Sequence, residues 1–551
     1  MKINKIFLIL VIITLLGGLL RFYKLSNFPV SLNVDEVSIG YNSYSILLTG
    51  KDEYGNPLPL SFRSLNDYKP PLYFYLTAIS IFIFGLTEFS VRFPSAFLST
   101  LSIPLFYFIF KKLTDNYKVS LLASFLFALS PWSIAFARTS SEATVANFFM
   151  GLGILGLLYF LSGKRYLGMI SAICFALSMY TYHSTKLFVP LFIAIILFLY
   201  KRQIVLLRTH IILAFVIFVV LITPLFLNTF FGPDITRAQM TVIGNDPQLK
   251  QNVNLIEDVQ KSGLEFNNLQ NINYQNLNII FHWSRKYLAY FQPSFLSFNS
   301  LSMTHPWQIG LGVLYIFELP FLLYGAFTFL RQKNIYMKFL IAWLIIGIIP
   351  ASLTLSEQHP IRTLIIMPIF PLLSAIGFFE LLKVIKGWQR KIFLGLLTIF
   401  AIWNFLWAFS VYFLFYPSQR GEGLMEGSRE VVEYILANQG SYEKIVFDPN
   451  RGLEGPYLVN VPHLYLLFYS KYDPTKYQNI KKEFKENSFV FDKYEIRNIY
   501  WPNDRFSKDT LFVGTVWSIP DIDIKKEQIL RTIYLKNGRE GYRVVVPEGL
   551  N

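Results

Sequence analysis

The residues best suited to chemistry follow the first apolar segment of the chain. Asp35 and Glu36 stand side by side, and Lys69 opens a Lys-Pro-Pro-Leu-Tyr element further on. An ionised carboxylate can take a proton from an attacking hydroxyl group, and a lysine ammonium at a membrane surface can balance the charge of a phosphate. Each residue alone also has an ordinary explanation, because loop carboxylates are usually solvated and lysines extend toward lipid headgroups.

Other polar residues lie beside apolar segments and are weaker candidates. For Arg138 with Glu142 the alternative is a local ion pair at a helix end. For His183, a lone histidine among aromatic residues, it is a structural hydrogen bond. Asp52 and Glu53 are interpreted as part of a turn before Gly55. The weaker candidates are Tyr41, Arg138, Glu142, His183, Lys186, His359 and Arg362.

The composition shows which elements must position these residues. Of the 551 residues, 53% are apolar and only 15% are charged, with a mean hydropathy of +0.41. Soluble domains carry about 25% charged residues, so a soluble enzyme is unlikely on composition alone, and the 17% of aromatic residues exclude disorder. The net charge of +15 is explained by basic cytoplasmic loops rather than by nucleic acid. The single Cys174 excludes a disulfide and a cysteine metal cluster.

The apolar blocks predict an α-helical polytopic membrane protein with about eleven spans over residues 1–415. Each block approaches the ~20 residues that a bilayer requires. The first block is interpreted as an uncleaved helix, because no small-residue cleavage site precedes Arg21. The predicted spans are Ile6–Leu20, Arg92–Lys111, Ser120–Ala137, Ala143–Leu161, Tyr166–Tyr182, Leu187–Tyr200, Thr209–Leu227, Gln308–Leu330, Tyr336–Leu355, Arg362–Leu382 and Lys391–Phe413.

The loops between these spans differ in charge. Basic residues crowd one set, in which Asp115 is the one clear acid, and this set is predicted to be cytoplasmic. Pro70–Thr87 is uncharged and long enough to cross, but a crossing would invert the later loops, so we predict an interfacial helix on the outer surface. The segment Tyr287–Phe298 is also predicted to be interfacial. The outer loops are then 22–91, 138–142, 183–186, 228–307 and 356–361, the last containing Glu357.

Residues 416–551 alternate turn signals with short apolar segments, which predicts an extracytoplasmic α/β domain. It contains no phosphate loop and no catalytic triad. The predicted helices are Ser428–Asn438 and Tyr457–Tyr469, and the predicted strands are Lys444–Phe447, Ser488–Phe491, Ile496–Tyr500, Leu511–Val516, Ile529–Leu535 and Tyr542–Val546.

The sequence resembles the GT-C glycosyltransferases, and among them the protein O-mannosyltransferase and aminoarabinose (lipid A) transferase superfamily. The resemblance rests on the Asp-Glu pair after the first span and the Lys-Pro-Pro-Leu-Tyr element. The stretches 85–95 (GLTEFSVRFPS) and 129–138 (LSPWSIAFAR) extend it over roughly the first 200 residues. It implies a GT-C fold and transfer of a sugar from a polyprenyl-phosphate donor to an extracytoplasmic acceptor, in the plasma membrane.

The resemblance also implies roles for individual residues. Asp35 would be the general base of an inverting transfer, with Glu36 as a supporting or substrate-binding residue. Lys69 would bind the donor phosphate, with Arg138 and Arg362 as further phosphate ligands. No metal or other cofactor is predicted, since no metal-ligand spacing is present.

Two points stay open at this stage. The sugar is not defined, and the acceptor can be a protein, a lipid or a glycan. The alternative function is a polyprenyl-linked sugar transporter or flippase without chemistry of its own, for which inverted repeats and polar residues at mid-membrane depth are expected. An oligosaccharide ligase is a further enzyme alternative, which the Lys-Pro-Pro element and the early carboxylate pair argue against.

Overall fold

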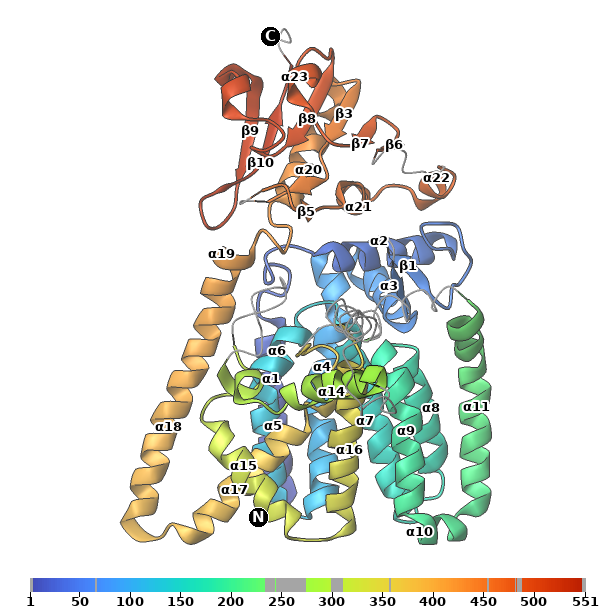
Figure 1. Ribbon diagram of the computed structural model, residues 1–551, viewed down its shortest axis with the longest axis vertical. Coiled ribbons are helices and arrows are strands. Elements are labelled where there is room, and N and C mark those ends of the chain that lie inside the picture. Colours follow the sequence, from blue (N-terminus) through green and yellow to red (C-terminus); the bar gives the residue numbers. More distant parts are fainter. Residues whose placement is uncertain are drawn as a thin grey trace, which may run out of the picture.

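The computed structural model describes residues 3–64, 67–232, 243, 274–298, 311–355, 358–452, 455–480, 482 and 488–547. These residues form three layers (Figure 1). A helical bundle makes up the lower part, a thin layer with α2 (Val34–Thr49) and α3 (Leu72–Phe84) lies above it, and a sheet region is at the top. We call residues 416–547 the C-terminal region.

The bundle consists of long apolar helices that run side by side. Seven of the described helices are long and apolar enough to cross a membrane, and the bent pair α5–α6 makes up to eight. Shorter apolar helices, α8, α9 and α15, run beside them (Figure 1). The chain is therefore a multi-pass membrane protein. The bundle helices are α1 (Ile3–Phe22), α4 (Glu88–Thr114), α5 (Tyr117–Leu129), α6 (Pro131–Ala137), α7 (Glu142–Leu161), α8 (Leu167–Met179), α9 (His183–Leu199), α10 (Lys201–Leu206), α11 (Arg208–Phe231), α15 (Glu318–Leu330), α16 (Ile335–Ser352), α17 (Ile369–Val384) and α18 (Gly387–Ser410).

Two predicted spans differ from the helices observed. Ser120–Ala137 was expected as one helix, but it bends by 51° between α5 and α6. Pro131 has no N–H to continue α5 and instead begins α6, which Ser130 caps through its side chain. Gln308–Leu330 was expected as one span, but its helix begins only at Glu318, after a turn. Residues 308–310 of that span lie outside the described part.

In the layer above the bundle, a capping box fixes the first turn of α2. The Asn33 side chain accepts hydrogen bonds from the backbone N–H groups of Asp35 and Glu36, and the Glu36 carboxylate accepts one from the Asn33 N–H. This reciprocal capping box satisfies N–H groups that would otherwise lack partners. The short hairpin of β1 (Phe62–Ser64) and β2 (Asp67–Lys69) follows α2 and leads into α3.

The segment Pro70–Thr87, predicted to be interfacial, contains α3. This helix has 13 residues, so at about 1.5 Å per residue it is about 20 Å long, shorter than a hydrocarbon core of about 30 Å. It lies beside α2 above the bundle in Figure 1. Exposed Ile79, Phe82 and Ile83 lie on the second half of α3, as expected for a helix in contact with the lipid surface.

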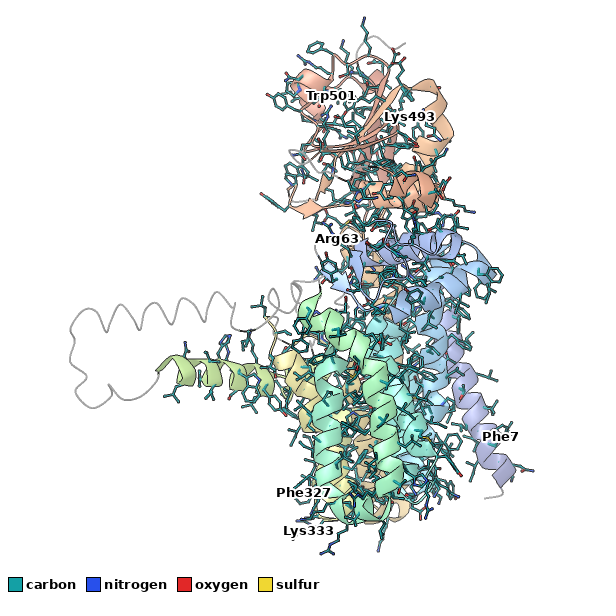
Figure 2. The ribbon with its side chains drawn as sticks, turned by 90° about the vertical axis from the view of Figure 1, so that its right-hand side faces the viewer. Phe7, Arg63, Phe327, Lys333, Lys493 and Trp501 are labelled. Carbon is teal, nitrogen blue, oxygen red and sulfur yellow. The ribbon has the colours of Figure 1, made fainter. Side chains whose placement is uncertain are left out.

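A second helix, α14 (Tyr274–Ala289), lies across the axes of the bundle helices and projects to the side in Figure 2. The Trp283 indole donates to Ser352, and the Lys286 ammonium donates to the carbonyls of Thr354 and Leu355, which fixes α14 to the end of α16. The predicted interfacial segment Tyr287–Phe298 is only partly α-helical, because α14 ends at Ala289 and a π-helix covers Ser294–Phe298. Most of the predicted outer loop 228–307 lies outside the described residues.

The C-terminal region is built on a six-stranded sheet in the order β6-β7-β3-β8-β10-β9. The central β3 is parallel to β7 and β8, and the outer pairs are antiparallel. Figure 2 shows Lys493 and Trp501 in this region and Lys333 at the opposite end of the molecule. The elements are α19 (Tyr416–Arg420), α20 (Ser428–Asn438), β3 (Lys444–Phe447), β4 (Asn450–Arg451), β5 (Leu458–Val459), α21 (Pro462–Tyr469), α22 (Pro474–Gln478), β6 (Phe489–Phe491), β7 (Tyr494–Ile496), α23 (Trp501–Asp504), β8 (Thr510–Gly514), β9 (Ile529–Tyr534) and β10 (Glu540–Val545).

The expected mixture of helices and strands is therefore present, with two corrections. The helix predicted for Tyr457–Tyr469 starts only at Pro462, because residues 458–459 form β5. The strand predicted for Ile496–Tyr500 lies at Tyr494–Ile496 instead, where a tight turn at Asp492 and Lys493 pairs it with β6.

The layer of α2 and α3 shares its hydrophobic core with the C-terminal region. Val37 and Ile39 of α2 and Phe74 of α3 belong to one buried cluster with Leu464 and Phe468 of α21. The interior of the bundle forms a separate cluster. The start of α2 is thus packed between the bundle and the C-terminal region.

Candidate functional site

A polar pocket of about 670 Å³ lies where the α2 layer meets the bundle. Four separate segments contribute to it: the start of α2, the end of β2, the turn between α6 and α7, and the chain between α16 and α17. The lining residues are Asp35, Lys69, Thr139, Ser140, Ser141, Glu142, Tyr182, His359, Ile361 and Arg362.

The Lys69 ammonium is at the centre of a group of carboxylates. Its Nζ lies 3.1 Å from Oδ1 of Asp35, 3.9 Å from Oε1 of Glu142 and 4.0 Å from Oδ2 of Asp67. The Lys69 side chain is only 6% exposed, whereas that of Asp35 is 48% exposed. The pocket therefore presents a solvent-accessible carboxylate beside a buried positive charge.

Two of these carboxylates lie in the first turns of helices. Asp35 is the second residue of α2, and Glu142 is the first residue of α7, which Ser141 caps. The backbone N–H groups of a helix N-terminus stabilise negative charge. Both carboxylates therefore lie where the N-terminus of a helix favours negative charge.

The opposite wall carries a second positive charge. Arg362 follows a turn in which the His359 N–H donates to the Tyr290 hydroxyl at 2.9 Å. Nη1 of Arg362 is buried and has no hydrogen-bond partner among the described residues. Arg362 lines the pocket, so its guanidinium supplies positive charge to this wall.

Comparison with known proteins places this pocket in a known fold. Residues 68–227 match the family model of the dolichyl-phosphate-mannose-protein mannosyltransferases. ArnT from Cupriavidus metallidurans in the apo state is 12% identical, with 97% of each chain covered and a TM-score of 0.54. The same protein bound to undecaprenyl phosphate is 13% identical, with 99% of each chain covered and a TM-score of 0.54.

The Archaeoglobus fulgidus oligosaccharyltransferase tethered to an acceptor peptide is 14% identical, covering 98% of this chain and 74% of that one with a TM-score of 0.53. No curated protein matches the sequence. The chain has the GT-C glycosyltransferase fold. The GT-C fold implied by the family resemblance is confirmed, and so is the C-terminal α/β region predicted from the alternation of turn signals and apolar segments.

Within the GT-C fold, Glu36 is not part of the pocket lining. It is 1% exposed, and its carboxylate binds the Arg92 guanidinium at 2.9 and 3.0 Å and the Ser140 N–H at 3.0 Å. This position does not support the substrate-binding role predicted for Glu36, because its carboxylate is enclosed by Arg92 and backbone N–H groups. The supporting role remains compatible with this geometry, since Ser140 lines the pocket.

Arg138 and Tyr41 also lie outside the pocket. The Arg138 guanidinium is buried and donates to the carbonyls of Leu20, Arg21, Tyr23 and Phe28, so the prediction that it binds phosphate is not supported by its position. The Tyr41 ring is buried under the C-terminal region, where its hydroxyl donates to the Tyr472 carbonyl at 3.2 Å. Both side chains brace the structure.

His183 and Lys186 lie near the pocket without lining it. His183 is the first residue of α9, and its Nε2 lies 3.0 Å from the Tyr68 carbonyl, directly before Lys69. The Lys186 ammonium donates to the Thr229 hydroxyl at 3.0 Å. His183 is thus placed to support β2, whereas Glu142, His359 and Arg362 are brought together with Asp35 and Lys69 as predicted candidates of one site.

Sequence reasoning missed several residues of the pocket. Thr139, Ser140 and Ser141 line it from the turn before α7, and Tyr182 lines it from the turn before α9. The run Thr-Ser-Ser-Glu between two apolar segments was the available signal, because it marks a helix cap at the predicted outer edge. Glu357 of the predicted outer loop 356–361 lies outside the described residues.

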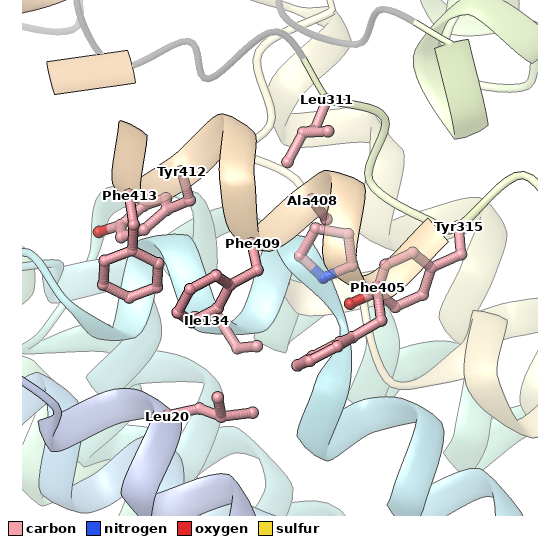
Figure 3. Close-up of a pocket in the computed structure, with 10 residues that line it drawn as sticks. Leu20, Ile134, Leu311, Tyr315, Phe405, Ala408, Phe409, Tyr412 and Phe413 are labelled. Carbon is pink, nitrogen blue, oxygen red and sulfur yellow. The ribbon is translucent and has the colours of Figure 1, made fainter. Parts of the chain in front are cut away.

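A second, apolar pocket of about 370 Å³ lies between α1, α6 and α18 (Figure 3). Rings from α18, including Phe405 and Phe409, point toward Ile134 of α6 and Leu20 of α1, and the π-helix Val411–Phe415 after α18 adds Tyr412 and Phe413 to the lining. In contrast to the polar pocket, the residues that line this one include no carboxylate and no cation.

Proposed function

We propose that the protein transfers a sugar from a polyprenyl-phosphate donor to an acceptor hydroxyl or amine, with Asp35 as general base and Lys69 as ligand of the donor phosphate. The observation that carries the proposal is the 3.1 Å pair of an exposed Asp35 carboxylate and a buried Lys69 ammonium in a GT-C pocket. The match to ArnT bound to undecaprenyl phosphate supports the class of donor. The match of residues 68–227 to the mannosyltransferase model supports sugar transfer.

The proposed reaction is a single displacement at the anomeric carbon. The acceptor oxygen or nitrogen attacks from the face opposite the phosphate, its proton passes to the Asp35 carboxylate, and the bond from the anomeric carbon to the phosphate oxygen breaks. The polyprenyl phosphate leaves with the bonding electron pair. Because the acceptor attacks from the opposite face, the anomeric centre is inverted. Asp35 suits the base because its carboxylate is the more exposed one, at 48% against 14% for Glu142.

Donor binding would also prepare the base. In the structure Lys69 is paired with Asp35, which holds the carboxylate in an ion pair. A donor phosphate would compete for the Lys69 ammonium and bind the Arg362 guanidinium in the same pocket. Asp35 would then be released to accept the proton only when a donor is present, which limits wasteful turnover.

We further propose that transfer needs no metal ion. The leaving group is already a phosphate, and Lys69 and Arg362 supply positive charge at the place where negative charge develops. A chelator added to the transfer assay should leave the rate unchanged. A loss of rate that Mg²⁺, Mn²⁺ or Zn²⁺ restores would contradict this part of the proposal.

The pocket and the C-terminal region are proposed to face the outside of the plasma membrane. The basic end of the bundle, marked by Lys333 in Figure 2, then faces the cytoplasm in accordance with the positive-inside rule. In a Cys174→Ser background, Leu58→Cys near the pocket layer should be labelled by an impermeant maleimide on intact cells, and Asp115→Cys should not. Both positions are exposed in the structure, so the reverse pattern would overturn the orientation.

The decisive experiment compares donor binding and product formation in one preparation of Asp35→Asn. The variant keeps the shape of the side chain but removes the base, so transfer should fall by at least about 10²-fold while donor binding is retained. Asp115→Asn makes the same chemical change at the far end of the bundle and serves as control. Release of free polyprenyl phosphate from a panel of polyprenyl-phosphate sugars measures the reaction.

Two outcomes would change the conclusion. Intact donor binding with a wild-type rate in Asp35→Asn would remove Asp35 from the mechanism, and a loss in Glu142→Gln instead would assign the base to Glu142. Movement of the lipid-linked sugar across the bilayer with no release of polyprenyl phosphate from any donor would favour a transporter. The acceptor class can be read from the same assay by offering a peptide, a lipid and a glycan in turn.

A further inference from the structure

The segment that leads into α2 is irregular, and its backbone carbonyls are held from outside. The buried Arg92 guanidinium of α4 donates to the carbonyls of Leu25 and Pro29 at 3.0 Å each and to that of Ser31 at 2.6 Å. The same guanidinium binds the Glu36 carboxylate in the first turn of α2. Arg92 alone thus holds this segment at three of its carbonyls.

The next carbonyl in the segment is held by the C-terminal region. The Tyr465 hydroxyl of α21 donates to the Leu32 carbonyl at 2.6 Å, and the Tyr465 side chain is fully buried. Leu32 is itself 0% exposed, and the other donor to its carbonyl, the Ser31 hydroxyl, is more distant at 3.3 Å and belongs to the same segment. The hydrogen bond joins residues 433 positions apart in the sequence.

We propose that Tyr465 is a positioning residue through which the C-terminal region sets the place of Asp35 in the pocket. Leu32 directly precedes Asn33, whose side chain accepts from the Asp35 N–H at 2.8 Å and the Glu36 N–H at 3.1 Å. A shift at Leu32 therefore moves the cap and the first turn of α2. The effect on catalysis rests on the proposed function, whereas the effect on α2 does not.

The Asp35 side chain has little restraint of its own. It is 48% exposed, and its described side-chain contact is the 3.1 Å ion pair with Lys69. Lys69 comes from β2, a different element, so the pair depends on where the backbone of α2 begins. A hydroxyl that fixes the Leu32 carbonyl acts on the geometry of the pair without touching a substrate.

The neighbouring Tyr469 supplies a matched control. It lies one turn further along α21, and its hydroxyl donates to the Glu88 carboxylate of α4 at 3.1 Å. That carboxylate also binds the Arg429 guanidinium at 3.1 Å. Tyr469→Phe therefore removes a hydroxyl from the same interface, but not one that holds the segment before Asp35.

The experiment compares full-length Tyr465→Phe and Tyr469→Phe with the wild type, since both changes keep the ring and its packing. Amide hydrogen exchange of residues 31–37, measured without substrate, should be roughly tenfold faster in Tyr465→Phe, as expected for loss of one buried hydrogen bond. It should be unchanged in Tyr469→Phe. The turnover number should fall roughly tenfold in Tyr465→Phe with the Kd for polyprenyl phosphate within about twofold.

The outcomes separate the inference from the proposed function. Equal exchange at residues 31–37 in both variants and the wild type would overturn the inference, as would equal losses of turnover in both variants. If the wild-type protein releases no polyprenyl phosphate from any donor, the proposed function fails, and the exchange measurement alone still decides whether Tyr465 holds the start of α2. A large rise in Kd with unchanged turnover would assign Tyr465 to donor binding and contradict the inference.

Discussion

Two charged groups lie on adjacent residues of α2 and have opposite surroundings. Asp35 faces the pocket, where its half-exposed carboxylate shares Lys69 with two further carboxylates. Glu36 points into the interior, where Arg92 and two backbone N–H groups enclose it. Both carboxylates form ion pairs, Asp35 with Lys69 and Glu36 with Arg92, but only the first pair lines the pocket. The two pairs carry the same charges, so the difference between them is exposure: the Asp35 carboxylate is accessible to a ligand, and the Glu36 carboxylate is not.

Breaking the enclosed ion pair of Glu36 and Arg92 should have the largest effect on stability. Arg92→Met leaves the Glu36 carboxylate buried without its cation and should lower the free energy of unfolding by about 3–5 kcal/mol. Thermal unfolding of the detergent-solubilised protein measures the change. Lys383→Met removes one partner of an exposed ion pair with Glu380 and should cost less than about 1 kcal/mol. Equal effects in the two variants would mean that the burial of the Arg92 pair does not contribute to stability.

The buried carboxylate of Glu53 extends the comparison, because its effect on stability should depend on pH. Glu53 is buried beside Asn42, which donates to it at 3.0 Å, and burial raises its pKa to about 7. Because the pKa is raised in the folded state, protonated Glu53 contributes fully to the free energy of unfolding below the usual value of 4.5. This contribution is lost as pH rises through about 7. Over that window the loss is on the order of 3 kcal/mol.

Glu53→Gln stays neutral at every pH and should remove this dependence. The difference in unfolding free energy between wild type and variant should be small at pH 4.5 and should favour the variant at pH 8. Unfolding curves collected from pH 4.5 to pH 8 test the sign. A constant difference over that range would show that Glu53 does not titrate within it.

Removing Lys69 from its pair with Asp35 should lower the free energy of unfolding less than Arg92→Met does. It should specifically weaken ligand binding. Lys69→Ala should weaken binding of polyprenyl phosphate by roughly 10- to 100-fold, because a charge-assisted hydrogen bond contributes about 1.5–3 kcal/mol. Lys69→Arg should recover only part, since a guanidinium differs in shape from an ammonium. Lys51→Ala, at an exposed lysine of the same loop, is the control. Unchanged affinity in Lys69→Ala would leave Lys69 as a headgroup anchor.

Much of the fold followed from local properties of the sequence. Apolar blocks and basic loops predicted the membrane bundle, because each of these signals lies within a short stretch. The GT-C fold followed from the family resemblance carried by the Asp-Glu pair and the Lys-Pro-Pro element. The bent pair at Ser130 and Pro131 was readable in the same way but was merged into one span. The late start of α15 was not readable, since the turn before Glu318 is as apolar as a helix.

Residues of the candidate site were predictable only where their exposure does not depend on partners that are distant in the sequence. Asp35 and Lys69 were placed together by their order along the chain. Whether a neighbouring residue faces inward depends on distant partners: Arg92, 56 residues away, encloses Glu36, and Tyr472, 431 residues away, covers Tyr41. Arg138 was misassigned for the same reason, because the carbonyls that bind it belong to the end of α1 and the loop after it.

The close packing of α2 against α21 has a consequence for how the sequence can vary. A side chain at Gly40 would place its Cβ 2.5 Å from the Phe468 ring and 3.0 Å from Val91. Any larger residue at position 40 would push α2 and α21 apart unless the residue at position 468 became smaller at the same time. Homologues that differ at one of these two positions should therefore differ at the other, so that the pair would change together in evolution.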